Sequence, residues 1–319
     1  MKTKIIFKTK DTSQKIVESS AILYMPKNPI GVYFIHHGTI FTNDMAPTNN
    51  AVIYDTVAKL FVEKNYIVVF PDYIGFGISY ETHFHPYLHK ENLAKNSFGL
   101  LEHLLETNVI DSNLRIYSAG YSEGGYASLA FVELAQKNNI IIDSINGAAP
   151  YDIAESMSCL LEGSIYEYPE YISYIAHAYE KIYHLDGLVK NLFKSIYAQI
   201  TYKAYEERYP FDRMHKIYPR ELCRFIDFDF LYGESELMAT FKSKLEENSL
   251  SSFVPIGKTT LFSARDDEIV NVNISIEMYK KRKSAVNIDL KIDEDENSSH
   301  FGSYPKFLSL ILKDLNNEQ

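Results

Sequence analysis

The chain has 319 residues, of which 46% are hydrophobic and 23% are charged, and its formal net charge at pH 7 is −10. This length suits one large domain that carries an insertion, or two domains of modest size. Nucleic-acid-binding proteins usually present a basic face or stripe, so the acidic balance argues against DNA or RNA as a partner.

The two cysteines, Cys159 and Cys223, exclude a disulfide framework and a CxxC metal knuckle. We expect two reduced thiols and a reducing compartment, with one disulfide between them as the alternative. The N-terminal segment MKTKIIFKTKDTSQ has an apolar run too short for a signal peptide, and no apolar run is long enough to cross a membrane. These features predict a soluble protein of the cytoplasm, or an exported protein if a leader has been removed.

Short apolar runs alternate with helical patterns along most of the chain. The first two runs, Ile5–Phe7 and Ala21–Tyr24, have no helix between them, which predicts an antiparallel hairpin at a sheet edge. The later runs alternate with helices and predict an α/β fold in which a mostly parallel sheet is flanked by helices on both faces. The predicted strands of this sheet are Val32–Ile35, Ile67–Phe70, Leu114–Tyr117, Ile140–Ile145, Thr259–Phe262 and Val286–Ile292.

Apolar residues also recur at helical spacing, and each such set predicts one buried stripe. The strand pattern stops between Asp152 and Pro255, where the chain is helix-like and rich in tyrosine. We interpret this segment as an inserted helical cap, so that residues 1–151 and 256–319 form the two parts of the core and residues 152–255 form the cap or lid. The four predicted stripes are Ile53, Val57, Leu60 and Phe61; Ala94, Phe98, Leu101 and Leu105; Ala127, Ala130, Phe131 and Leu134; and Leu308, Ile311, Leu312 and Leu315.

The segment AGYSEGGYA places Ser122 between glycines at the point where a predicted strand becomes a predicted helix. A serine hydroxyl is a weak nucleophile and needs a base within reach and donors that hold the oxyanion. Gly120 and Gly124 lack the side chains that would collide in a sharp strand-to-helix turn, where the serine would take a strained conformation with its oxygen exposed. The segment therefore predicts a nucleophile at Ser122, and an ordinary glycine turn is the alternative.

Two backbone amides are candidates for the oxyanion hole. The amide of Glu123 is free at the helix N-terminus. The amide of Thr39 follows the strand Val32–Ile35, and Gly38 would let the backbone turn it toward Ser122. We expect the Glu123 carboxylate to be a helix-start group favoured by the helix dipole, with a role as catalytic acid as the alternative.

In this architecture the acid and the histidine follow the serine in chain order, each at the carboxyl end of a later strand. The strand Thr259–Phe262 leads to Asp266 and Asp267, and we favour Asp267 because the apolar pair Ile269–Val270 can then pack down and hold the loop. After one more helix and strand, His300 is in position to act as the base. The alternatives are a solvated loop aspartate and a solvent-facing loop histidine.

Three segments, FIHHGTIFTNDMAPTNN, VVFPDYIGFGISYETHFHPYLHKENLAKN and AGYSEGGYA, together resemble the α/β-hydrolase superfamily. Within it they are most similar to bacterial members related to secretory lipases, which carry comparable HGT, PDY-G-G-S, HPY and GYS-GG segments in this order. The resemblance covers Gly31–Pro150 specifically and the Asp and His segments more loosely. It implies an α/β-hydrolase fold and carboxylic ester hydrolysis with no cofactor. The site residues that it implies are the nucleophile Ser122, its partners Asp267 and His300, and the oxyanion donors Glu123 and Thr39.

Other histidines have a structural interpretation. The histidines of the segment THFHPYLH could be considered as metal ligands. Pro86 interrupts any regular spacing and the sequence offers them no acidic partner, so we expect contacts near the mouth of the site and no metal. We expect His36 and His37 to shape their loop and not to ionise.

The sequence thus predicts a serine esterase or lipase that works through an acyl-enzyme. Because tyrosine supplies apolar area with a polar tip, we expect the cap to form a wall over Ser122 that suits uncharged acyl or aromatic esters. A serine peptidase or amidase of the same fold is one alternative, because the same triad cleaves amides. A non-catalytic ligand-binding protein is another, because a fold does not imply an activity.

Overall fold

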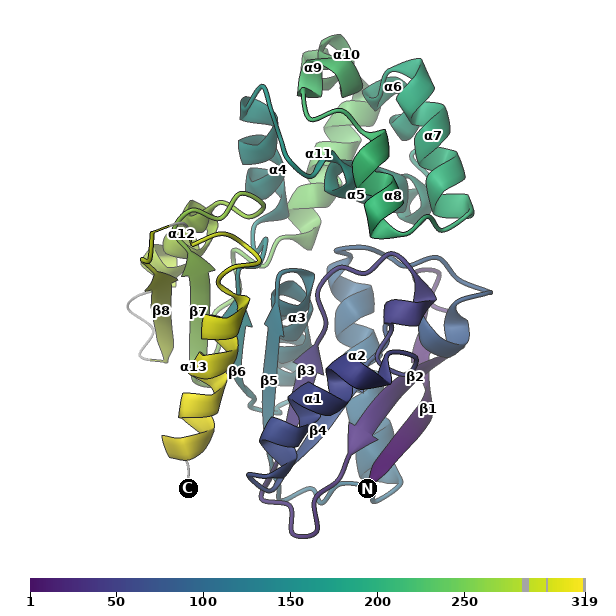
Figure 1. Cartoon of the computed structure of the whole chain (residues 1–319). Helices are drawn as coiled ribbons and strands as arrows, with labels where there is room; N and C mark the ends of the chain where they lie inside the picture. The colour runs from purple at the N-terminus through teal and green to yellow at the C-terminus, as the bar shows by residue number, and fades with distance from the viewer. Residues whose placement is uncertain (283–286, 297, 318–319) are drawn as a thin grey trace.

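The computed structural model of the chain describes residues 1–282, 287–296 and 298–317. An eight-stranded sheet with the order β1-β2-β4-β3-β5-β6-β7-β8 forms its centre (Figure 1). Strands β1 and β2 pair antiparallel, β2 pairs antiparallel with β4, and each neighbouring pair from β4 to β8 is parallel. The predicted edge hairpin and parallel sheet are confirmed. The strands are β1 Lys2–Lys10, β2 Ile16–Tyr24, β3 Gly31–His36, β4 Tyr66–Pro71, β5 Arg115–Tyr121, β6 Asp143–Gly147, β7 Thr259–Ala264 and β8 Ile288–Asp293.

Two strands begin at least two residues later than the apolar runs predict. Strand β6 begins at Asp143 and not at Ile140, because Asn139 takes a left-handed φ of 62° in the turn that leads back to the sheet. Strand β8 begins at Ile288, and Val286, where the sequence predicted its start, lies outside the described residues.

Helices cover both faces of the sheet. Helices α1 (Ala51–Val62) and α13 (Tyr304–Asn317) lie on the near face in Figure 1, while α2 (Lys90–Glu106), α3 (Glu123–Lys137) and α12 (Val272–Arg282) lie on the far face. Because strand side chains alternate between faces, the two larger clusters of buried side chains in the described part of the chain lie on opposite sides of the sheet. Two short 3₁₀ helices, η1 (Asn43–Met45) and η2 (Gly77–Ser79), follow β3 and β4.

One residue of the predicted helix stripes, Ile53, is not buried as the sequence predicted. Ile53 on α1 is 55% exposed, whereas Phe61 on the same helix is fully buried against the sheet. Ile53 lies in the first turns of α1, at a cavity near the carboxyl end of the sheet, and not over the strands.

The chain between β6 and β7 forms a layer of helices beyond the carboxyl ends of the strands (Figure 1). Tyr174 from this layer stacks on Tyr87 of the core with ring centres 4.3 Å apart, and Tyr126 on α3 donates a hydrogen bond to the carbonyl of Asn248. These contacts hold the helical layer on the sheet. Its helices are α4 Ile153–Glu162, α5 Pro169–Tyr183, α6 Leu188–Leu192, α7 Ser195–Glu206, α8 Phe211–Ile217, α9 Leu222–Phe225, α10 Phe228–Tyr232 and α11 Glu236–Asn248.

Two further sequence features can be placed. Cys159 and Cys223 both carry free thiols. Among the helices that the structure describes, none is long and apolar enough to span a membrane.

Candidate active site

Ser122 stands between β5 and α3 in a conformation that few residues other than glycine adopt. Its φ is 59° and its ψ is −127°. Such a backbone costs about 1–3 kcal/mol and persists only when the surroundings hold it. The Ser122 amide donates to the carbonyl of Gly147 on β6 at 2.8 Å, and the Ser122 carbonyl accepts from Tyr126 in the first turn of α3. The turn therefore has one bond to the sheet and one to the helix.

Glycine is required on both sides of Ser122 because other parts of the backbone lie very close to these positions. A Cβ atom on Gly120 would lie 2.1 Å from the carbonyl oxygen of Gly124, and a Cβ on Gly124 would lie 2.2 Å from the carbonyl oxygen of His36. Neither position tolerates a side chain. The expectation that these glycines permit a sharp strand-to-helix turn is confirmed.

The structure brings His300 and Asp267 into contact. His300 Nδ1 lies 2.9 Å from Asp267 Oδ1 and 2.8 Å from Oδ2, and the two side chains are 2% and 0% exposed. Because a carboxylate only accepts, Nδ1 carries the proton, so Nε2 of the neutral ring is free to accept one. The neighbouring Asp266 is exposed. Of the two aspartates that the sequence offered, Asp267 is the one that contacts the histidine.

The loop that carries Asp267 is fixed by its own backbone. The amides of Ile269 and Val270 donate to Asp267 Oδ1 at 2.9 and 2.7 Å, and both apolar side chains are buried. The Glu268 carboxylate accepts from the amide of His300 at 2.9 Å. The aspartate and the histidine are therefore held both through their side chains and through the backbone.

Sequence reasoning did not find the contribution of Tyr121. Its hydroxyl donates to the carbonyl oxygen of His300 at 2.6 Å across 179 residues of chain. Burial raises the pKa of Tyr121, so the hydroxyl keeps the proton that it donates. Since Tyr121 directly precedes Ser122, this bond ties the histidine loop to the serine turn. Only the position of Tyr121 next to the serine in the sequence could have suggested this role.

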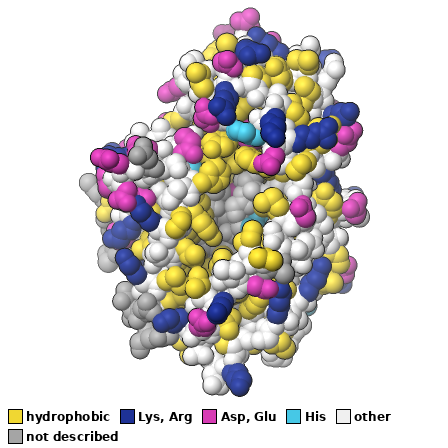
Figure 2. Space-filling view, viewed as in Figure 1, with side chains coloured by type: hydrophobic (Ala, Val, Ile, Leu, Met, Phe, Trp, Pro, Cys, Tyr) yellow, Lys and Arg dark blue, Asp and Glu magenta, His cyan; other side chains and the backbone are white. Residues whose placement is uncertain are grey.

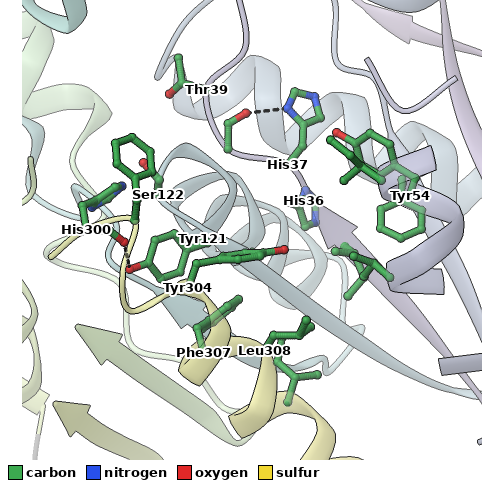
Figure 3. A pocket seen from close by; sticks show the side chains of 18 of the residues that line it. His36, His37, Thr39, Tyr54, Tyr121, Ser122, His300, Tyr304, Phe307 and Leu308 are labelled. Atoms are coloured by element: carbon green, nitrogen blue, oxygen red, sulfur yellow. Dashed lines mark hydrogen bonds between the residues drawn. The ribbon is translucent and has the colours of Figure 1, made fainter. Parts of the chain in front are cut away.

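Ser122, His300 and Thr39 all line one cavity of about 230 Å³ (Figure 3). In the described part of the chain, Ser122 Oγ makes no hydrogen bond to His300. Catalytic hydrogen bonds of this kind are often long in unliganded proteins and tighten when substrate binds. The cavity nonetheless brings the predicted nucleophile and base to one surface.

The segment Gly38–Thr39 lies against the serine turn. A Cβ on Gly38 would lie 3.3 Å from the carbonyl oxygen of Tyr121 and 3.8 Å from Ser122 Cβ, so close approach is what favours glycine here. The Thr39 hydroxyl shares a 3.0 Å hydrogen bond with the Tyr87 hydroxyl, which anchors the loop. Glu123 is the first residue of α3, where an amide has no partner within the helix. Both proposed oxyanion donors therefore belong to segments that adjoin Ser122.

Glu123 begins helix α3, as the sequence predicted, but its side chain does not lie at the surface. It is buried, and its Oε1 atom lies 2.6 Å from Nε2 of His85, which is buried too. His85 Nδ1 lies 3.0 Å from the carbonyl oxygen of Ile74. Besides its place at the helix start, Glu123 contacts His85, because helix α3 begins beneath the loop that carries the HPY segment. Sequence spacing gave no signal for this contact between residues 38 apart.

Three other histidines near the site, His36, His37 and His89, are buried and have lowered pKa values. His89 Nδ1 accepts from the amide of Asn92 at the start of α2, and burial lowers the pKa of His89 to about 4. Burial also lowers the pKa of His36 to about 3 and lowers that of His37. These rings are neutral at pH 7. Within the described residues, no group of three or more His, Cys, Asp or Glu side chains is placed to hold a metal ion.

The cap contributes less to this cavity than its tyrosine content predicted. Tyr171 lines the cavity, but most of its walls come from the sheet, α1 and α13. Many tyrosines of the helical layer pack into its interior instead; the Tyr174 ring, for example, is stacked 4.8 Å from that of Tyr205. The expectation of a tyrosine wall over Ser122 is wrong, because these rings are used to bury the helices against each other and the core.

The same fold occurs in solved hydrolase structures. The chain superposes on a protein from Legionella pneumophila that is provisionally named a hydrolase, with a TM-score of 0.88 and 21% identity, over 99% of this chain and 88% of that one. It also superposes on the rice cell wall degrading esterase LipA from Xanthomonas oryzae, with a TM-score of 0.84 and 16% identity, over 100% and 91% of the two chains.

A third similar structure is lipase A from Candida antarctica, with a TM-score of 0.73 and 15% identity, over 94% of this chain and 73% of the lipase. No family model matches the chain, and no curated protein matches it. Together with the strand order and the serine turn, the superpositions show that the chain has the α/β-hydrolase fold.

Proposed function

We propose that this protein is a carboxylic ester hydrolase that works through an acyl-enzyme on Ser122. The observation that carries the proposal is the bond from His300 Nδ1 to Asp267, which leaves Nε2 as the free acceptor at the cavity that Ser122 lines. Esterase and lipase names among the similar structures support the same class of reaction.

In the proposed mechanism His300 Nε2 takes the proton of the Ser122 hydroxyl as its oxygen attacks the ester carbonyl. Asp267 keeps the ring in the required tautomer and stabilises the imidazolium that forms. The amides of Glu123 and Thr39 hold the negative oxygen of the tetrahedral intermediate. His300 then gives its proton to the leaving alcohol, and the same nitrogen activates a water that releases the acid.

The substrate that we propose is a small uncharged ester. None of the described residues that line the cavity is Asp, Glu, Lys or Arg. A charged acyl group would therefore be desolvated there without a counterion, which is strongly unfavourable.

A fluorophosphonate probe tests the proposal directly. We expect stoichiometric labelling of the wild-type protein at Ser122, found by peptide mass spectrometry, and turnover of p-nitrophenyl esters. Absence of both in the folded protein would contradict the proposal. Labelling together with cleavage of peptide amides, and no ester turnover, would favour a peptidase.

A further inference from the structure

The cavity at Ser122 continues away from the cap, between α1 and α13. Figure 3 shows Tyr54 from α1 and Tyr304, Phe307 and Leu308 from α13 around the same space as Ser122. Its floor is the face of the sheet that carries Ile35 on β3, Phe70 on β4 and Gly120 on β5. The cavity thus enters the layer between the sheet and its helices.

The inner part of this space is apolar and its mouth is open. Phe61, Phe307 and Ile311 are at most 3% exposed, so the inner wall is part of the hydrophobic cluster on this face. At the mouth, Ile53 and Phe301 are more than half exposed. Figure 2 shows a hollow on this face with hydrophobic side chains along its rim. Exposed apolar rims of this kind mark binding surfaces.

We propose that this groove binds the apolar chain of the ester. An apolar cavity of about 150 Å³ accommodates benzene, and a water-sized group occupies about 30 Å³, so a 230 Å³ cavity suits a chain of roughly six to eight carbons or a single aromatic ring. The inference rests on the proposed function, because it names the substrate of the same site. The apolar chain can belong to the acyl group or to the alcohol of the ester. Two series of substrates, one varied in each part, separate these possibilities.

A larger cavity in the helical layer is the alternative binding site for the apolar chain of the ester. It measures about 600 Å³ and is lined by apolar residues of the layer, including Leu161 and Ile172, and by charged ones as well. The charged residues are Asp152, Glu155, Glu162, Lys242 and Glu246. Neither Ser122 nor His300 lines it. On α5, Tyr171 faces the site cavity while the adjacent Ile172 faces the larger one, so the helix separates the two spaces. A chain bonded to Ser122 begins in the smaller cavity.

The test is chain-length selectivity in variants that narrow the groove. Val57 on α1 and Leu308 on α13 line the cavity from its two helices and are only partly buried, so Val57→Phe and Leu308→Phe add side-chain volume to the groove. We expect each to lower the ratio of kcat/KM for p-nitrophenyl octanoate to that for p-nitrophenyl acetate by tenfold or more, since one methylene in an apolar pocket already accounts for about tenfold.

The matched control is Leu161→Phe in the larger cavity, which should leave the octanoate-to-acetate ratio unchanged. A second series, alkyl acetates from methyl to octyl followed in a pH-stat, repeats the comparison for the alcohol. A response in the acyl series assigns the groove to the acyl chain, and a response in the acetate series assigns it to the alcohol; either supports the groove as the binding site.

Unchanged ratios in both series for both groove variants would overturn the inference, and so would a loss confined to Leu161→Phe. Fluorophosphonate labelling of Ser122 in each variant separates the two proposals. If Ser122 is labelled but the ratios do not move, the groove assignment fails and the proposed function stands. If wild-type Ser122 is not labelled and no ester turns over, the proposed function fails.

Discussion

Nε2 of His85 lies 2.6 Å from the carboxylate of Glu123, the residue that follows the candidate nucleophile. His85 Nδ1 faces the carbonyl oxygen of Ile74, which only accepts, so this nitrogen donates. Nε2 then either donates to the carboxylate as part of an imidazolium or accepts from a protonated carboxyl. In both cases the buried pair shares one proton, and it ties the HPY loop to the first residue of α3.

Removal of one member of this pair should destabilise the protein. In Glu123→Ala the His85 ring is left buried without its partner, and breaking a buried pair costs about 3–5 kcal/mol. We expect a loss of about 3 kcal/mol in urea unfolding. We also expect kcat to fall about tenfold with little change in KM, because the amide of residue 123 is a proposed oxyanion donor and acts in the transition state.

Glu133→Ala on the same helix is the control, because Glu133 pairs with Lys137 near the surface, where such pairs contribute about 0–1 kcal/mol. The double variant His85→Phe with Glu123→Leu should recover part of the lost stability, since apolar replacement of both partners is often neutral. A single Glu123→Ala variant as stable and as active as the wild type would show that the pair has no positioning role.

Ser122→Ala should remove nearly all esterase turnover. The proposed mechanism has no other nucleophile, so kcat should fall by about 10⁵ or more, and the residual rate should come from binding and the oxyanion donors. Serine and alanine both carry a Cβ atom, so the strained φ of 59° costs the two residues a similar free energy. Circular dichroism should therefore show an unchanged fold. A variant that kept a tenth of the wild-type rate would exclude Ser122 as the nucleophile.

The two adjacent aspartates should differ sharply. In the wild type His300 Nδ1 donates to the Asp267 carboxylate, and Asp267→Asn replaces that carboxylate by an amide. The amide favours the wrong tautomer of the His300 ring, so kcat should fall by about 10⁴-fold. Asp266→Asn, at an exposed position of the same loop, is the matched control and should change kcat little. The comparison uses steady-state kinetics of purified, folded variants, and the reverse ranking would refute the assignment of Asp267.

Acid should destabilise the protein through His36. Its ring is 2% exposed, neither ring nitrogen has a partner among the described residues, and burial lowers its pKa from 6.5 to about 3. The unfolded chain therefore takes up a proton near pH 6.5 that the folded chain refuses until about pH 3. This contribution to stability is complete above pH 6.5 and is lost as the pH falls, by up to about 1.4 kcal/mol per pH unit.

The variant His36→Phe tests this origin, because the ring lies among Tyr73 and Phe131, where an apolar side chain is suited. Between about pH 6 and pH 4 we expect its unfolding free energy to fall less steeply than that of the wild type, by about 1.4 kcal/mol per pH unit. Equal slopes for His36→Phe and the wild type would contradict the prediction.

The features that the sequence predicted well depend on the spacing of residues that are close together in the chain. A strand, a turn and a helix are set by neighbouring residues, so the glycines around Ser122 indicate a sharp turn through their spacing alone. The order of serine, aspartate and histidine followed from the chain order that this architecture gives them, each at the carboxyl end of a later strand. The boundary of β6 was less accurate, because Asn139 turns the chain where its apolar neighbours suggested a strand.

By itself, the sequence determined the parallel sheet with its edge hairpin and the positions of Ser122, Asp267 and His300 along the chain. Only the tertiary structure decided that Glu123 is buried on His85 and that the site cavity opens between α1 and α13 and not under a wall of cap tyrosines. The physical reason is that burial and contact depend on how segments far apart in the chain pack together. The spacing of apolar residues indicates whether a segment is a helix or a strand, but it does not indicate which other segment packs against that helix or strand.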